Sequence, residues 1–273
     1  MSAPPPLAGV VGWPVGHSRS PALHGHWLKL YGLSGAYVAM AVAPDALATA
    51  LKGLVALGFA GCNVTLPHKE QALALADAAT DRARRIGAAN TLAIRQGRIE
   101  ADNTDGFGFI ENLRQGAPDW SAAAGPALVL GAGGAARAIV AALLDAGAPE
   151  VLIANRTPER AEALAAALGA RAIPWAAAEA AAAEAATLVN TTSLGMAGQP
   201  PLDLSLDRAR ADALATDIVY APLETAFLRR AAARGLRTVD GLGMLLHQAR
   251  PGFEAWFGVA PEVDEALRQA VLA

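Results

Sequence analysis

The stretch that most constrains the fold of this chain is a short apolar run that stops at glycines and restarts as an alanine-rich helix. Residues 127–130 predict a buried strand, and the helical pattern ends near Ala146. Strand, glycine turn and helix in this order are the context that a G-x-G-x-x-G/A dinucleotide fingerprint requires. Its helix N-terminus would offer N–H groups to phosphates. The turn residues are Gly131, Ala132, Gly133, Gly134 and Ala135.

The end of the next predicted strand, residues 150–154, indicates which dinucleotide this turn would bind. An NAD site usually has an acid there for the ribose 2′-hydroxyl, whereas this chain has Asn155, Arg156 and Thr157, followed by Arg160. Because a guanidinium binds phosphate oxygens bidentately, Arg156 favours the 2′-phosphate of NADP. The alternative is that Thr157 only caps a helix and that both arginines are solvated.

Composition excludes several classes of function. The 273 residues are 53% hydrophobic with a net charge of −3, which suits two α/β domains and argues against a nucleic-acid partner. No apolar run is long enough to span a membrane, and the N-terminus does not resemble a signal peptide. A single cysteine, Cys62, excludes an internal disulfide and fits the cytoplasm. His24 and His26 fall on different faces of a predicted helix, so we expect no metal site.

Strand and helix patterns alternate in the first half of the chain and predict a second α/β domain. We expect strands at residues 7–12, 36–41 and 61–65 and a hairpin at 91–101. Thr80 is predicted to cap a helix that Gly87 ends. Ser20 is predicted to cap a helix, which leaves Ser18 without a structural reason. Two hydroxyls at this junction could bind a small polyol or carboxylate.

Lysine is rare in this chain, so the position of Lys69 is informative. Only Lys29 and Lys52 accompany it among 22 basic residues. Pro67 ends the third strand and places Asn63, Thr65 and Lys69 near its carboxyl end, where open α/β sheets bind ligands. An ammonium there can lose a proton, which a guanidinium cannot. The polar residues 102–106 further offer Asp105 as a carboxylate that could face Lys69, and Asn90 is a neutral hydrogen-bonding group.

The second half predicts a doubly wound sheet of six strands. After the first two strands we expect strands at residues 172–173, 187–190, 216–219 and 237–239. The alanine run 176–186 predicts one helix, residues 244–256 predict a long helix, and Pro261 is expected to start the last one.

Several motifs taken together resemble the shikimate dehydrogenase family. They follow the family's order and spacing over nearly the whole chain, at residues 12–21, 63–69, 87–91, 102–106, 131–135, 155–157, 190–196 and 240–244. The resemblance implies reversible reduction of 3-dehydroshikimate to shikimate with NADPH, in the pathway to aromatic amino acids. Three departures, Thr191, Ala221 and Ala226, bear on cofactor affinity more than on the reaction.

The resemblance also assigns roles to residues. Lys69 and Asp105 would be the catalytic pair. The shikimate pocket would contain Ser18, Ser20, Thr65, Lys69, Asn90, Asp105, Tyr220 and Gln248, and the cofactor would lie near Asp81, Ile218, Gly241 and the glycine turn. A charged Asp105 favours protonated Lys69, so the way Lys69 becomes a base for oxidation stays open.

The expected architecture is α/β with two domains. Residues 1–104, completed by helices at 241–273, would form a substrate-binding domain, and residues 105–240 a Rossmann-type NADP-binding domain. We expect small-molecule partners, no metal and a homodimer as the assembly to test. Two alternatives are a quinate/shikimate dehydrogenase that prefers NAD, which Arg156 argues against, and a nucleotide-binding protein without turnover, which Lys69 and Asp105 argue against.

Overall fold

The computed structural model describes residues 4–273, which divide into two compact units. The first unit contains the described residues up to Thr104 together with Gln248–Ala273, and the second contains Asp105–His247. The chain returns to the first unit inside helix α10 (Leu242–Phe257), whereas the sequence placed the return at residue 241. No helix within residues 4–273 has the length and apolarity needed to cross a lipid bilayer.

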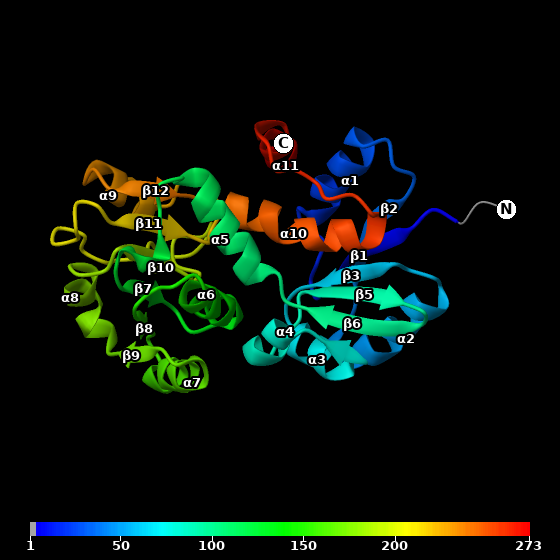
Figure 1. Ribbon diagram of the computed structural model, residues 1–273, viewed down its shortest axis with the longest axis horizontal. Coiled ribbons are helices and arrows are strands. Elements are labelled where there is room, and N and C mark those ends of the chain that lie inside the picture. Colours follow the sequence, from blue (N-terminus) through cyan, green and yellow to red (C-terminus); the bar gives the residue numbers. More distant parts are fainter. Residues whose placement is uncertain (1–3) are drawn as a thin grey trace. The chain divides into compact units, whose positions relative to one another are not determined.

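The first unit contains a six-stranded mixed sheet in the order β2-β1-β3-β5-β6-β4 (Figure 1). Strands β1, β2 and β3 are parallel, β5 runs antiparallel to β3 and β6, and β4 pairs parallel with β6. The predicted hairpin is confirmed, and its turn has positive φ at Gln96 and Gly97, as tight hairpins prefer. The strands are β1 Leu7–Gly12, β2 Ala36–Ala41, β3 Gly61–Val64, β4 Ala78–Ala79, β5 Thr91–Arg95 and β6 Arg98–Asp102.

Helix starts in the first unit both confirm and correct the sequence predictions. Thr80 caps α4 as predicted, because its side chain accepts a hydrogen bond from the Ala83 N–H. Ser20 does not cap α1: the helix already begins at Ser20, and the Ser18 hydroxyl accepts from the Ser20 N–H at 3.3 Å. The helices are α1 Ser20–Leu30, η1 Pro44–Ala46, α2 Leu47–Ala56, α3 Lys69–Leu75, α4 Asp81–Ile86 and α11 Glu265–Leu272.

The last helix starts later than predicted. It begins at Glu265 rather than at Pro261, because the side chain of Asp264 accepts from the Leu267 N–H and so caps it. A proline can occupy the first turn of a helix, but a side-chain acceptor fixes the start here.

The second unit contains six parallel strands in the order β12-β11-β10-β7-β8-β9. Counted from β7, this is the Rossmann order, and the predicted doubly wound sheet is confirmed. The fifth strand differs from the predicted 216–219: β11 ends at Asp217, because the Asp217 carboxylate accepts from the Val219 N–H and turns the chain. The strands are β7 Ala127–Leu130, β8 Val151–Ala154, β9 Arg171–Ile173, β10 Thr187–Asn190, β11 Leu214–Asp217 and β12 Arg237–Val239.

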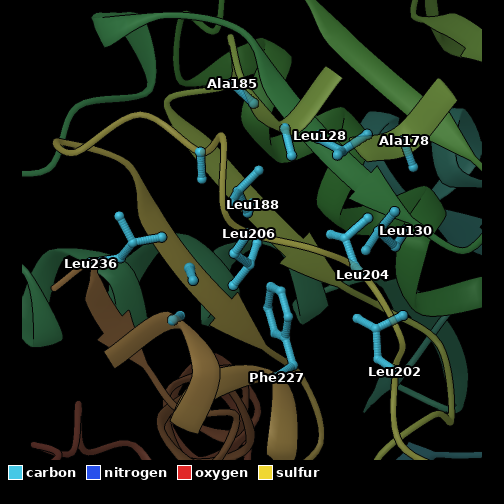
Figure 2. Close-up of a cluster of buried hydrophobic side chains, with 14 of the residues drawn as sticks. Leu128, Leu130, Ala178, Ala185, Leu188, Leu202, Leu204, Leu206, Phe227 and Leu236 are labelled. Carbon is cyan, nitrogen blue, oxygen red and sulfur yellow. The ribbon is translucent and has the colours of Figure 1, made fainter. Parts of the chain in front are cut away.

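The helices of the second unit enclose a core of leucine and alanine. Figure 2 shows part of this core, in which Leu128, Leu188 and Phe227 come from β7, β10 and α9. The alanine run is not one helix from 176 to 186: the helix ends at Ala182, and Ala185 then packs into the core before β10. The helices are α5 Asp105–Gly116, η2 Ala122–Ala124, α6 Gly134–Asp145, α7 Pro158–Leu168, η3 Trp175–Ala177, α8 Ala178–Ala182, α9 Ala226–Ala233 and the first part of α10.

Candidate active site

The carboxyl ends of β1 and β3 meet closely in the first unit and position Thr65. A Cβ atom on Gly12 would lie 2.5 Å from Cγ2 of Thr65, so only glycine allows this approach. The Thr65 N–H donates to the Val11 carbonyl at 2.9 Å, and the Trp13 N–H donates to the Leu66 carbonyl at 3.1 Å. These two backbone hydrogen bonds therefore hold the turn that leads to Ser18 against the segment that contains Thr65.

The two serines of this turn have different environments. Ser20 is buried in the first turn of α1, while Ser18 is half-buried and its hydroxyl oxygen accepts from the Ser20 N–H. A serine hydroxyl that accepts one bond can still donate its own proton. The Ser18 hydroxyl can therefore donate to an anionic ligand while its oxygen accepts from the Ser20 N–H at the start of the helix.

Lys69 and Asn90 are brought to the same end of the sheet by backbone hydrogen bonds. Lys69 is the half-exposed first residue of α3, and its carbonyl accepts from the Ala89 N–H at 2.9 Å. The Asn90 carbonyl accepts from the Val64 N–H at 2.8 Å, next to Thr65. The backbones of Lys69 and Asn90 therefore lie near the end of β3, where Thr65 also lies.

Asn90 and Gln248 are joined directly, although 158 positions separate them in the chain. The Asn90 Nδ2 donates to the Gln248 Oε1 at 3.2 Å, and the Asn90 Oδ1 accepts from the Thr104 N–H at 2.8 Å. The Thr104 hydroxyl donates to the Gln248 carbonyl at 2.8 Å. Because a backbone N–H can only donate, the Asn90 amide has a fixed orientation.

The Asn63 side chain holds the Asn90 backbone in place by hydrogen bonds, a role that the sequence did not indicate. Its Nδ2 donates to the Asn90 carbonyl at 3.1 Å and to the Thr91 hydroxyl at 3.2 Å, while its Oδ1 accepts from the Tyr37 hydroxyl at 2.7 Å. Asn63 was placed correctly near the end of β3. No pattern connects it to Tyr37 on β2, so only the sheet order reveals this contact.

His24 lies in α1, the helix predicted for it, and its side chain belongs to the core. Its ring is fully buried and stacks on Tyr37 at a centroid distance of 3.9 Å. Burial lowers the pKa of His24 to about 3, so its ring is neutral at physiological pH. Among residues 4–273, no three His, Cys, Asp or Glu side chains gather as metal ligands would.

Asp105 begins α5 and belongs to the second unit, whereas Lys69 belongs to the first. The Asp105 side chain is buried at 7% exposure. A Cβ on the next residue, Gly106, would lie 2.9 Å from the Ala138 carbonyl, so glycine lets the start of α5 pack on α6. The pairing of Lys69 with Asp105 stays a prediction.

The glycine turn of the second unit has the form that its motif predicted. Gly131 has φ of +112°, and a Cβ there would lie 2.5 Å from the Thr191 hydroxyl. Gly133 and Gly134 are exposed, and a Cβ on either would meet nothing within 4 Å. Ala136 is fully buried where α6 packs on the sheet. The bare backbone at the start of twelve-residue α6 therefore suits a pyrophosphate.

Arg156 and Arg160 follow β8, the strand next to β7, and both are exposed. Neither guanidinium forms an ion pair within the part of the chain that the structure describes. Asn155 holds this turn, since its Nδ2 donates to the Thr157 carbonyl at 2.9 Å. Thr157 is the N-cap residue of α7 and Pro158 begins the helix, as the alternative expected, but the Thr157 side chain makes no capping hydrogen bond. Two unpaired cations suit a 2′-phosphate.

The remaining predicted cofactor residues, Ile218, Gly241 and Asp81, lie in different places, and Tyr220 of the predicted shikimate pocket lies near the first two. Ile218 and Tyr220 are half-buried in the loop after β11, and a Cβ on Gly241 would lie 2.5 Å from the Ile218 carbonyl carbon. Gly241 therefore packs its backbone against Ile218. Asp81, by contrast, belongs to the first unit, where it is exposed at the start of α4 and forms an ion pair with Arg84 at 3.2 Å. Its assignment to the cofactor stays a prediction.

Comparison with known proteins agrees with these features along the chain. Residues 10–92 match the shikimate dehydrogenase substrate binding domain, residues 117–196 match the shikimate / quinate 5-dehydrogenase family, and residues 241–272 match the shikimate 5′-dehydrogenase C-terminal domain. A protein of Rhodospirillum rubrum named shikimate dehydrogenase (NADP(+)) is 66% identical, over 97% of this chain and 96% of its own length.

Two solved structures show the same fold. Shikimate 5-dehydrogenase from Thermus thermophilus, in complex with NADP(H) and shikimate, is 42% identical with a TM-score of 0.89, over 98% of both chains. Quinate dehydrogenase from Corynebacterium glutamicum, in complex with NAD, is 31% identical with a TM-score of 0.90, over 98% of this chain and 99% of its own. From its matched domains, its relatives and its fold, this chain belongs to the shikimate dehydrogenase family, a family of oxidoreductases.

Proposed function

We propose that this protein catalyses the reversible, NADPH-dependent reduction of 3-dehydroshikimate to shikimate, with Lys69 and Asp105 as the catalytic pair. The observation that carries the proposal is the combination, in one chain, of a glycine turn with exposed Gly133 and Gly134, later followed by Arg156, and of a polar sheet end with Lys69, Asn90 and Gln248. Relatives 57–66% identical are named shikimate dehydrogenase (NADP(+)), which supports both the reaction and the cofactor.

The residues of the second unit fit NADP rather than NAD. Gly133 and Gly134 leave the backbone at the start of α6 open to a pyrophosphate, and the segment after β8 carries two guanidiniums, without ion pairs among residues 4–273, where an NAD site has a carboxylate. When bound, the cofactor supplies a hydride to the carbonyl carbon of the substrate. Gly131 and Gly133 would hold its pyrophosphate, and Arg156 and Arg160 its 2′-phosphate.

The residues of the first unit fit a small polyhydroxy acid. The hydroxyls of Ser18 and Ser20 would bind its carboxylate, Thr65 would line the pocket, and the amides of Asn90 and Gln248 would bind its ring hydroxyls. As the carbonyl oxygen gains negative charge, the Lys69 ammonium would donate a proton to it. Asp105 would orient that ammonium and accept a hydrogen bond from a substrate hydroxyl. In the oxidative direction Lys69 would take the same proton back.

A paired assay tests the reaction and the specificity together. Wild-type protein is mixed with shikimate or quinate and with NADP⁺ or NAD⁺, and the absorbance of the reduced cofactor is followed. We expect the highest kcat/KM with shikimate and NADP⁺. A higher value with quinate and NAD⁺ would assign the chain to the quinate branch, and nucleotide binding without turnover would assign it as a binding protein.

Assembly is a separate proposal. We propose a homodimer, which is tested by the mass of the purified protein from light scattering, and a monomeric mass at micromolar concentration would contradict it.

A further inference from the structure

Asp217 is a buried carboxylate that the proposed reaction leaves without a role. It is the last residue of β11, and its side chain is fully buried. No lysine, arginine or histidine within residues 4–273 forms an ion pair with it. Burial raises the pKa of Asp217, and its hydrogen bonds oppose that rise only in part. A buried acid without a cation costs free energy, so its presence in a parallel strand calls for a reason.

Three donors from three segments converge on this carboxylate. Its Oδ1 accepts from the Asn190 Nδ2 and from the Val219 N–H, both at 3.0 Å, and its Oδ2 accepts from the Thr225 hydroxyl at 2.8 Å. Asn190 ends β10, Val219 lies in the loop after β11, and Thr225 precedes α9. Asp217 therefore joins the end of one strand to both ends of the next loop.

Asn190 extends this network into the loop after β10. Its Nδ2 also donates to the Leu194 carbonyl at 3.0 Å, and its Oδ1 accepts from the Thr192 N–H at 3.0 Å and from the Thr192 hydroxyl at 2.7 Å. A backbone hydrogen bond from the Ala197 N–H to the Ala221 carbonyl at 2.9 Å also links the loop after β10 to the loop after β11. Both loops are thus built around the Asp217 carboxylate.

These loops carry residues that the proposed function uses. Ile218 and Tyr220 flank Val219, whose N–H is bound to Asp217, and the Ile218 N–H donates to the Asn190 carbonyl at 3.1 Å. The backbone of Ile218 is further restrained by the close approach of Gly241. All of them lie at the carboxyl edge of a parallel sheet, the edge at which doubly wound sheets bind ligands.

We propose that Asp217 is a positioning residue that, through Asn190 and Thr225, holds Ile218 and Tyr220 in the arrangement that cofactor and substrate binding require. The inference rests on the proposed function, because Ile218 and Tyr220 have their roles only within it. A neutral hydrophobic residue at 217 could fill the same space in the sheet but could not accept from three donors, which explains why the chain bears the cost of a buried acid.

The test compares two identical substitutions in the second unit. Thr225→Val removes the hydroxyl that donates to Asp217 and that also caps α9 by accepting from the Leu228 N–H at 3.3 Å. Thr187→Val, the control, removes the equally buried hydroxyl at the opposite end of β10, which accepts from the Trp120 Nε1 at 3.0 Å. Thr225→Ser restores the hydroxyl and serves as the rescue. For each variant we measure kcat, the KM for NADP⁺ and for shikimate, the Kd of NADPH by its fluorescence, and the thermal midpoint.

We expect Thr225→Val to raise the KM for both ligands and the Kd of NADPH about tenfold, the scale of one lost charge-assisted hydrogen bond. Thr187→Val should lower the thermal midpoint and leave these constants within about twofold of wild type, because its hydroxyl lies at the end of β10 away from the two loops. Thr225→Ser should recover most of the affinity. Equal constants for the two valine variants would make Asp217 purely structural and overturn the inference.

A crystal structure of the wild-type protein with NADP⁺ and shikimate gives an independent answer if Thr225→Val does not fold. We expect the bonds from Asn190 and Thr225 to Asp217 to persist, with Ile218 and Tyr220 in contact with the ligands. A complex in which the two residues lie away from both ligands overturns the inference. Absence of turnover in the wild-type protein would instead refute the proposed function, so the two failures are distinguishable.

Discussion

Lys69 and Asp105 are the two residues on which the proposed chemistry depends. Lys69→Ala should lower kcat by about 10²–10⁴-fold, the usual loss when a general acid–base group is removed. Asp105→Asn should cause a comparable loss, because the amide cannot orient the ammonium by its charge. Stopped-flow or steady-state oxidation of shikimate measures both. Lys52→Ala, in α2 of the same unit, is the matched control and should keep the wild-type rate. Near-normal turnover of Lys69→Ala would remove Lys69 from the mechanism.

We expect Arg156 to determine the preference of the protein for NADP⁺ over NAD⁺. Its side chain is exposed and has no ion pair within the described residues, so its removal costs little stability. Arg156→Ala should raise the KM for NADP⁺ by ~10- to 100-fold, because a charged hydrogen bond to phosphate is worth about 1.5–3 kcal/mol. The KM for NAD⁺ and for shikimate should not change. The exposed Arg208, changed to alanine, is the control. A uniform effect on NAD⁺ and NADP⁺ would show that Arg156 does not contact the 2′-phosphate.

At the scale of single elements, helix α4 shows a start that the sequence encodes completely. The Thr80 hydroxyl accepts from the Ala83 N–H at 3.2 Å, and Gly87, with φ of +74°, ends the helix. The same hydroxyl donates to Asp102 on β6 at 2.7 Å, so Thr80 also ties α4 to the sheet. Thr80→Ala should lower the free energy of unfolding by about 1–2 kcal/mol, and Thr80→Ser should recover most of it. Urea denaturation followed by circular dichroism measures the difference, and an unchanged midpoint for Thr80→Ala would contradict the capping role.

Other element boundaries could not be predicted because distant side chains set them. The sequence extended the fifth strand of the second unit to residue 219, whereas the Asp217 carboxylate turns the chain by accepting from the Val219 N–H. Ser20 looked like a cap, but the cap-like bond comes from Ser18. The proline at 261 gave a plausible helix start, yet Asp264 supplies the acceptor. In each case a side-chain acceptor outweighed a local propensity.

At the scale of the whole molecule, periodicity and motif order were sufficient for the architecture. Alternating strand and helix patterns with a glycine turn after one strand specify a doubly wound sheet, because parallel strands need helical crossovers of one hand. For the candidate site, the sequence predicted individual residues but not the contacts between them. The contact of Asn90 with Gln248 and the support of Asn63 by Tyr37 depend on which strands and helices become neighbours, which no local pattern contains.

The stability of the whole molecule should depend on pH through His24. Its pKa is about 3 in the folded protein because burial disfavours the charged ring, whereas an unfolded histidine has a pKa near 6.5. Between these values the unfolded chain binds more protons, so stability increases with pH over that window and is lost as the pH falls below about 6.5. From this group alone, unfolding should become about 2 kcal/mol easier between pH 7.5 and pH 5.

Replacing His24 with an aromatic residue that cannot be protonated isolates the contribution of His24 to the pH dependence of stability. His24→Phe preserves the stacking on Tyr37 and removes the titrating nitrogens, both of which are buried. We expect its free energy of unfolding, from urea curves at several pH values, to fall less than that of wild type on acidification, by the same ~2 kcal/mol. His17→Phe, at an exposed position, should keep the wild-type slope. Parallel curves for wild type and His24→Phe would show that the buried ring does not control acid stability, and acid unfolding would then have to begin in carboxylate pairs such as Arg82 with Asp102.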